Sequence, residues 1–156
     1  MRYYLDSAPI IFLVEQAQPY ATAVRRKLSA QGLTLITSEL TRMECRVKPL
    51  RNGDTALLQD FDDYFANSMA EIIQLTRDVI DRATEIRAQF NFKTADSIQL
   101  AAALVSNSGV FLTNDHRLNH FTELPKKAPS FQGGDEFGPA RAERGHYHLP
   151  QQSPMI

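Results

Sequence analysis

The stretch KTADSIQLAAALV, residues 93–105, predicts a helix that is apolar on nearly every side. A helix of this kind is buried, so it must lie between other elements of the protein. Thr94 is predicted to cap this helix, which puts Asp96 in the first turn. There a carboxylate gains about 0.3–1 kcal/mol from the helix dipole. That structural explanation competes with a functional role for Asp96.

Short apolar runs precede and follow this helix and alternate with helical patterns. The predicted strands are 2–6, 33–37, 69–76 and 110–113. The predicted helices are 18–32, from Ser38 as cap to Pro49, a segment around 57–65, 77–90, and the one from Thr94 to about Gly109. Strands that alternate with helices form a parallel sheet covered on both faces. The expected fold is therefore α/β, in three layers (α/β/α) around a central parallel sheet.

Composition limits the function classes. The chain has 156 residues and a formal net charge of −1, so it has no overall basic field of the kind that nucleic-acid-binding modules carry. Its one cysteine, Cys45, excludes an intrachain disulfide and is expected in the core. No apolar run approaches the ~20 residues of a membrane span, and the N-terminus does not resemble a signal peptide. We therefore expect a cytoplasmic protein.

The C-terminal part differs from the rest in composition. Residues 1–125 are expected to form the functional domain, and residues 126–156, rich in Pro, Gly and Gln, a poorly ordered tail. The segment after Leu124 has no pattern typical of a final edge strand. His146 and His148 in this tail form only a weak candidate for metal binding.

Four acidic residues lie where the predicted strands end. Asp6 and Asp115 follow the first and last strands, Glu44 lies in the helix after the second strand, and Asp96 begins the buried helix. Each has a structural explanation: a turn at a strand end for Asp6 and Asp115, and an i+4 ion pair with Lys48 for Glu44. Because parallel strands share one carboxyl end, we instead expect all four carboxylates at one edge of the sheet.

Carboxylates that lie close together repel one another, and this repulsion must be offset. Two of them ~5 Å apart repel by ~3 kcal/mol at an effective dielectric constant of ~20. Either their pKa values rise or a cation neutralises them. Oxygen-only ligands select hard cations such as Mg²⁺, Mn²⁺ or Ca²⁺, and such a site suits metal-assisted phosphodiester hydrolysis.

Four motifs, in order, resemble those of the PIN-domain nucleases, and most closely those of VapC-type toxins. They are YYLDSAPIIFLVE, TSELTRMECRVKPLR, KTADSIQLAAAL and FLTNDHRL, and the resemblance covers residues 1–124. It implies an α/β/α fold, an Mg²⁺- or Mn²⁺-dependent RNA-cleaving site and a cognate antitoxin. It also implies that Asp6, Glu44, Asp96 and Asp115 form the acidic quartet, with Ser7 and Thr113 as its usual polar companions. We add Asn114 as a supporting residue.

Basic residues near the acids are candidates for binding RNA phosphates. They are Arg42, Arg46, Lys48, Arg51, Lys93 and Arg117. A solvated charged surface explains them equally well. No aromatic platform for base stacking stands out, so base specificity is not predicted.

Other function classes fit less well. A phosphoaspartate phosphatase would carry a second aspartate two residues after Asp6, where this chain has Ala8. A receiver domain would carry adjacent acids after the first strand. A non-catalytic module that binds RNA or an antitoxin remains the alternative to a metal-dependent endoribonuclease, which we expect to leave 5′-phosphate and 3′-hydroxyl ends.

One predicted helix carries more apolar residues than a single stripe requires. They are Leu57, Leu58, Phe61, Tyr64 and Phe65. Core packing explains about half of them. Together with the resemblance, the surplus favours an antitoxin helix that docks nearby, and a homodimer.

Overall fold

The computed structural model describes residues 1–124, which form a four-stranded parallel sheet with helices on both faces. The strands are β1 (Arg2–Leu5), β2 (Thr34–Ser38), β3 (Glu71–Ile73) and β4 (Val110–Leu112), in the order β3-β2-β1-β4. All three pairings are parallel. The predicted central parallel sheet is confirmed.

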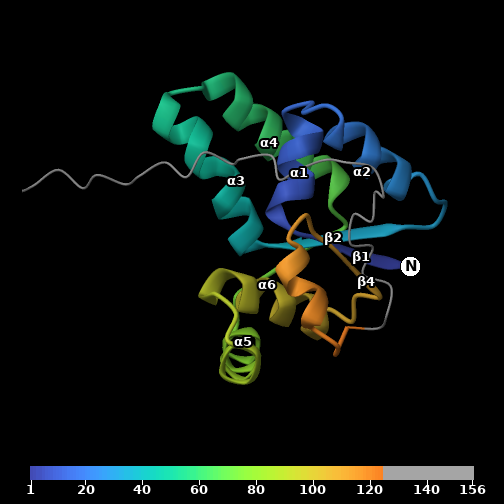
Figure 1. Ribbon diagram of the computed structural model, residues 1–156. Coiled ribbons are helices and arrows are strands. Elements are labelled where there is room, and N and C mark those ends of the chain that lie inside the picture. Colours follow the sequence, from blue (N-terminus) through green and yellow to red (C-terminus); the bar gives the residue numbers. More distant parts are fainter. Residues whose placement is uncertain (125–156) are drawn as a thin grey trace, which may run out of the picture.

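The helices form the two outer layers, so the predicted α/β/α architecture is also confirmed (Figure 1). Helices α1–α4 cover one face of the sheet, and α5 and α6 cover the other. Their bounds are α1 Ser7–Val14, α2 Tyr20–Leu28, α3 Glu39–Asn52, α4 Thr55–Ser68, α5 Arg77–Phe90 and α6 Thr94–Val105, followed by a 3₁₀ helix, η1, His116–His120.

Successive side chains of β1 point to opposite faces of the sheet and so contribute to two separate core clusters. Tyr4 packs with α5, α6 and Phe111, whose ring stacks on Tyr4 with centroids 5.4 Å apart. The next residue, Leu5, points to the opposite face and packs with residues of α1 and α4. Successive strand residues point to opposite faces of a sheet, so β1 is buried on both sides.

Helix α6 is the buried helix that its composition predicts. Leu100 and the alanines at 101–103 are at most 1% exposed. Small side chains let α6 lie close to both the sheet and α5. Cys45 is also buried, as predicted.

Several expected boundaries are corrected. Thr94 does not cap α6: Lys93 is the N-cap and makes no side-chain capping bond, while Asp96 does lie in the first turn. Helix α3 continues through Pro49 to Asn52 and ends at Gly53, whose positive φ of 65° suits glycine.

Three further elements are shorter than predicted. Helix α2 ends at Leu28 rather than Gly32, α6 ends at Val105 rather than near Gly109, and β3 spans Glu71–Ile73 only. Within residues 1–124, no helix is long and apolar enough to cross a bilayer. The predictions for residues 126–156 and for an edge strand after Leu124 lie outside the described residues.

Candidate functional site

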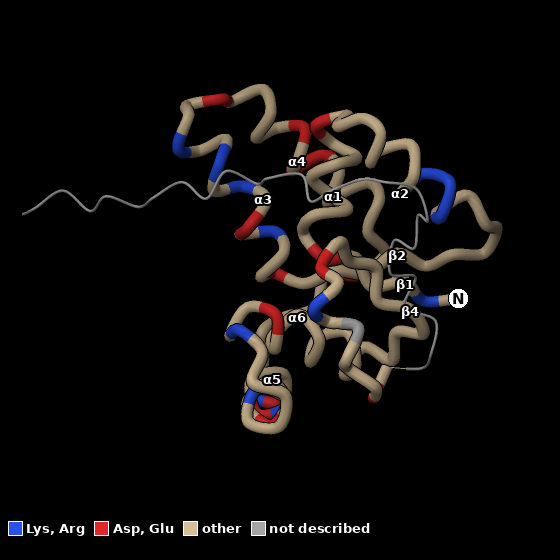
Figure 2. Tube along the Cα trace, in the orientation of Figure 1, with Lys and Arg blue, Asp and Glu red and all other residues tan. Residues whose placement is uncertain are grey.

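The candidate site lies where the direction of the chain across the sheet reverses. The chain passes from β1 to β2 and β3 on one side, then returns to place β4 on the other side of β1. In open parallel sheets, ligands bind at the carboxyl ends of the strands at such a position. Asp6 follows β1 there, and Thr113 follows β4. Figure 2 shows acidic residues gathered where β1, α6 and the segment after β4 meet.

Asp6 is held by two groups, one at the start of α1 and one just after β4. Its Oδ1 accepts a hydrogen bond from the Ser7 backbone N–H at 2.8 Å, and its Oδ2 accepts one from Thr113 Oγ1 at 2.8 Å. Thr113 Oγ1 in turn accepts from the Asp115 backbone N–H at 3.0 Å. Asp6 therefore caps α1 and is also joined through Thr113 to the segment that carries Asp115.

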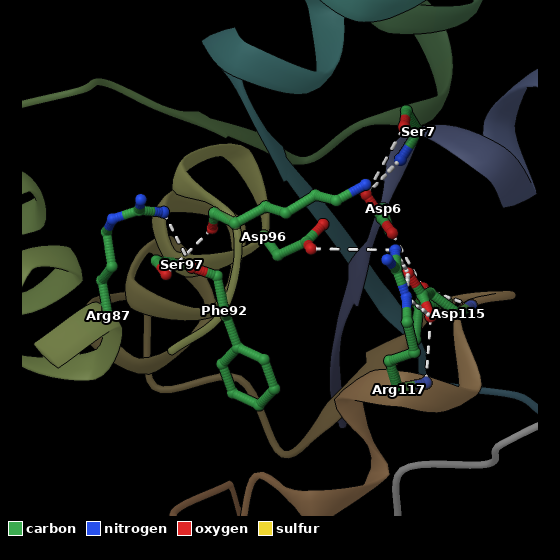
Figure 3. Close-up of polar contacts among 10 residues, drawn as sticks. Asp6, Ser7, Arg87, Phe92, Asp96, Ser97, Asp115 and Arg117 are labelled. Atoms are coloured by element: carbon green, nitrogen blue, oxygen red, sulfur yellow. Dashed lines mark hydrogen bonds and ion pairs between the residues drawn. The ribbon is translucent and has the colours of Figure 1, made fainter. Parts of the chain in front are cut away.

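Asp96 and Asp115 share a single cation, Arg117 (Figure 3). The Arg117 Nε lies 2.9 Å from each Asp115 oxygen, and its Nη2 contacts the same carboxylate and lies 3.9 Å from Asp96 Oδ2. Asp115 also caps η1, accepting from the Arg117 backbone N–H at 2.9 Å. The chain thus supplies its own positive charge to this part of the acidic cluster.

Glu44 reaches the cluster from α3. Its Oε2 accepts from Gln99 Nε2 at 2.9 Å, and Ser7 and Gln99 both act to lower the pKa of its carboxyl. Lys48, the expected partner of Glu44, instead lies 3.1 Å from Glu15. The structural explanation of Glu44 as half of an i+4 surface pair is therefore wrong.

Burial and mutual repulsion raise the pKa of three of the four acids. Desolvation is the main cause at Asp6, Glu44 and Asp96, and each of them also feels the negative charge of at least one other member. The pKa of Asp115 is lowered, chiefly by its hydrogen bonds from Arg117. All four predicted carboxylates therefore interact electrostatically at one edge of the sheet.

The donor set suits a hard divalent cation, since it consists of carboxylates and hydroxyls. Among residues 1–124, no three Asp, Glu, His or Cys side chains are placed close enough together to enclose a metal ion. Arg117 already pairs with two of the acids, Asp96 and Asp115. The chemistry of these side chains nevertheless suits a divalent metal ion. Asp6, Asp96 and Asp115, together with Glu44, are the residues that would hold it.

Four of the six predicted RNA-contact residues lie on α3 and two lie beside the acidic cluster. Of those on α3, Lys48 pairs with Glu15, and Arg51 is exposed in the last turn. Arg42 and Arg46 form ion pairs with Asp62 of α4, so three charges join α3 to α4. Figure 2 shows basic and acidic residues interspersed along α3. Lys93 and Arg117 instead lie beside the cluster, where their charges act on both Asp96 and Asp115.

Gln99 is the residue that sequence reasoning missed. It is 2% exposed and bonds to Glu44 from inside α6. A polar side chain in a helix that is otherwise apolar, three residues after Asp96, was the available signal. Nothing in the sequence identified its partner on α3. Asn114 is half-buried beside Asp115, and its role stays a prediction.

Residues 3–124 match the family model of the PIN domain. No curated protein matches the chain. Among solved structures, VapBC2 from Rickettsia felis, in complex with a DNA fragment from its promoter, superposes with a TM-score of 0.62 at 18% identity, covering 76% of this chain and 92% of that one.

Two further structures are similar. A toxin–antitoxin complex from Klebsiella pneumoniae has a TM-score of 0.59 at 21% identity and covers 79% of this chain and 92% of its own. VapC20 of Mycobacterium tuberculosis, a toxin that cleaves the sarcin–ricin loop, has a TM-score of 0.60 at 12% identity and covers 70% and 86%. At these identities the likeness establishes the shared fold.

Proposed function

Because the chain belongs to the PIN-domain family, we propose that it is a divalent-metal-dependent endoribonuclease and the toxin of a toxin–antitoxin pair. The observation that carries the proposal is the meeting of Asp6, Glu44, Asp96 and Asp115. They come from four separate segments and interact at the switch point of the sheet. A purely structural role for each acid would not require them to gather where three of their pKa values rise.

We assign the four acids different tasks. Asp6, Asp96 and Asp115 hold Mg²⁺ or Mn²⁺, and Glu44 either completes the set of ligands or orients the attacking water. When bound, the cation supplies Lewis acidity and neutralises charge on the scissile phosphate. Thr113 and Ser7 keep Asp6 in place through the hydrogen bonds described above.

RNA binding falls to the cations beside the cluster. Arg117 is 62% exposed in its side chain, and Lys93 is exposed, so both are accessible to a phosphate backbone. A backbone phosphate that binds Arg117 would draw the guanidinium away from Asp96 and Asp115. In this proposal, RNA binding therefore frees the Asp96 and Asp115 carboxylates from Arg117. An RNA substrate also implies that the protein acts in the cytoplasm.

A protein partner is supported by the apolar surface near α4. Phe61 and Phe65 are buried in the core, whereas Leu57, Leu58 and Tyr64 stay half-exposed. A hollow of about 620 Å³ lies between α1, α2 and α4. Its lining residues are Leu13, Val14, Gln16, Arg25, Asp60, Asp63 and Tyr64. We propose that an antitoxin helix docks there. Two similar structures are a VapBC assembly and a toxin–antitoxin complex.

A homodimer is proposed on a different surface. Met43, Val47 and Leu50 lie at i, i+4 and i+7 on α3, so they form one stripe. They are 56%, 41% and 58% exposed. A second copy of the chain that packs on this stripe would bury it.

The activity is tested on a mixed RNA substrate with the full chain. We expect cleavage with added Mg²⁺ or Mn²⁺, loss of cleavage in excess EDTA, and fragments with 5′-phosphate and 3′-hydroxyl ends. Cyclic phosphate ends, or cleavage that survives EDTA, would contradict the proposed chemistry. RNA binding without turnover under every metal condition would favour the alternative, a non-catalytic PIN module.

A further inference from the structure

The side chain of Gln99 joins the two helical layers at the edge of the sheet that carries the candidate site. It belongs to α6, which covers one face, and it contacts residues of α3, which covers the other (Figure 1). Its Oε1 accepts from Tyr4 Oη at 2.5 Å, from Thr41 Oγ1 at 3.0 Å and from Ser38 Oγ at 3.2 Å. Its Nε2 donates to Glu44 Oε2 at 2.9 Å.

These contacts determine which way the amide faces. Rotated by half a turn, the amide would place Oε1 against the Glu44 carboxylate, and two acceptors 2.9 Å apart repel. In the observed orientation, three hydroxyls direct their protons at Oε1, and an N–H points at Glu44. The orientation is assigned from this network, which is complete only with the amide N–H towards Glu44.

We propose that Gln99 is a positioning residue that holds the Glu44 carboxylate towards Asp6. The inference rests on the proposed metal-dependent function and assigns that site a group that the four acids do not include. Glu44 is half-buried, and its charge interacts with both Asp6 and Asp96. Without this donor, the long side chain of Glu44 would sample several rotamers. The fixed N–H of Gln99 therefore reduces the conformational entropy that is lost when Glu44 is ordered at the site.

The buried hydroxyls serve this arrangement indirectly. Tyr4 and Thr41 are fully buried, and their hydroxyls hold the amide from β1 and α3. Because the amide is held on its oxygen side, its nitrogen has a fixed place at the edge of the site. Groups that orient a metal ligand typically change metal affinity or activity 10–100-fold when they are removed.

The test is a double-mutant cycle on the full chain. Gln99→Met removes the N–H donor with little change in volume, and Glu44→Gln removes the carboxylate it orients. We measure Mn²⁺ affinity by calorimetry, together with kcat and KM for RNA cleavage. We expect Gln99→Met to weaken Mn²⁺ binding and to lower kcat about 10-fold each. In the Glu44→Gln background the same substitution should have almost no further effect.

Two controls separate positioning from stability. Ser106→Ala removes a buried hydroxyl, which bonds to the Ala103 carbonyl and to Ser108, at the opposite end of α6. It should lower the melting temperature and leave Mn²⁺ affinity unchanged. Gln99→Asn keeps an amide in the buried network but is one methylene shorter, which draws its N–H away from Glu44, so it covers the case in which Gln99→Met does not fold. It should also weaken Mn²⁺ binding.

The possible outcomes are distinct. Equal losses from Gln99→Met in both backgrounds, or no loss in either, would overturn the role of Gln99 while Mn²⁺ binding and cleavage by the unmodified chain still stand. An unmodified chain that neither binds Mn²⁺ nor cuts RNA would overturn the proposed function itself.

Discussion

The Arg117 guanidinium lies 3.9 Å from the Asp96 carboxylate while it also binds Asp115. An arginine of the chain itself therefore pairs with two of the acids that we propose as metal ligands and offsets one of their two negative charges. The side chain of Arg117 is 62% exposed, so its ion pairs are screened by water and can break at small cost. In the proposed function a metal ion would compete with Arg117 for Asp96 and Asp115, and this competition can be measured.

Replacing Arg117 should strengthen metal binding. Arg117→Ala removes the competing cation, and exposed ion pairs are each worth about 0.2–1 kcal/mol, so we expect Mn²⁺ affinity to rise about 2- to 5-fold. If Arg117 also binds RNA phosphates, KM for RNA should rise in the same variant. Arg82→Ala is the matched control, because Arg82 pairs with Glu85 and Glu123 instead of the cluster. Weaker Mn²⁺ binding in Arg117→Ala would show that Arg117 supports the metal site.

Removing the Asp6 charge should abolish cleavage. Asp6→Asn keeps the shape of the side chain but loses a charged ligand, and we expect kcat to fall at least about 100-fold. Calorimetry should show a parallel loss of Mn²⁺ affinity. A cleavage rate within a factor of two of the unmodified chain would mean that Asp6 only caps α1, where it accepts from the Ser7 backbone N–H.

The metal-free protein should become less stable as pH rises above about 4. The pKa values of Asp6, Glu44 and Asp96 are raised in the folded protein. Between the unfolded-state pKa and the raised value, the folded protein binds more protons than the unfolded chain, so these three groups lower the free energy of unfolding as they ionise. Asp115, whose pKa is lowered, acts in the opposite direction.

Urea melts with EDTA at several pH values test this expectation. Asp6→Asn should raise the free energy of unfolding at pH 7 and reduce its fall between pH 4 and pH 7. Asp81→Asn, on the exposed side of α5, controls for the loss of one negative charge far from the cluster. The same slope in Asp6→Asn and the unmodified chain would contradict the assignment of this pH dependence to the cluster.

A charge in the α3 stripe should prevent dimerisation. Leu50 is 58% exposed, so Leu50→Asp leaves the core intact and puts a carboxylate in the proposed interface. Light scattering at micromolar concentration should show a dimer for the unmodified chain and a monomer for the variant. Thr84→Asp, on α5, is the control for an added surface charge. A monomer in both cases would contradict the homodimer, and a dimer that survives Leu50→Asp would place the interface elsewhere.

The layers of the fold, and the meeting of the four acids at one edge of the sheet, were predictable from the sequence. Strand and helix patterns are local, and the all-round apolar composition of α6 required burial between other elements. Parallel strands share one carboxyl end, so Asp6 and Asp115 could be placed together before any coordinates. The position of Pro49 misled the prediction of α3, because the later turns of a helix can include a proline when the surrounding structure stabilises them.

The groups that bond to the acids could not be predicted from the sequence, because they come together only when the chain folds. Lys48 is four residues from Glu44, yet it pairs with Glu15, while Glu44 bonds to Gln99, 55 positions away in the chain. The sequence also did not predict which nearby basic residue pairs with the acids. The structure shows that Arg117 forms ion pairs with Asp96 and Asp115. The partner of a side chain depends on how the two helical layers pack at the edge of the sheet. Local sequence patterns do not predict which side chains this packing brings within bonding distance.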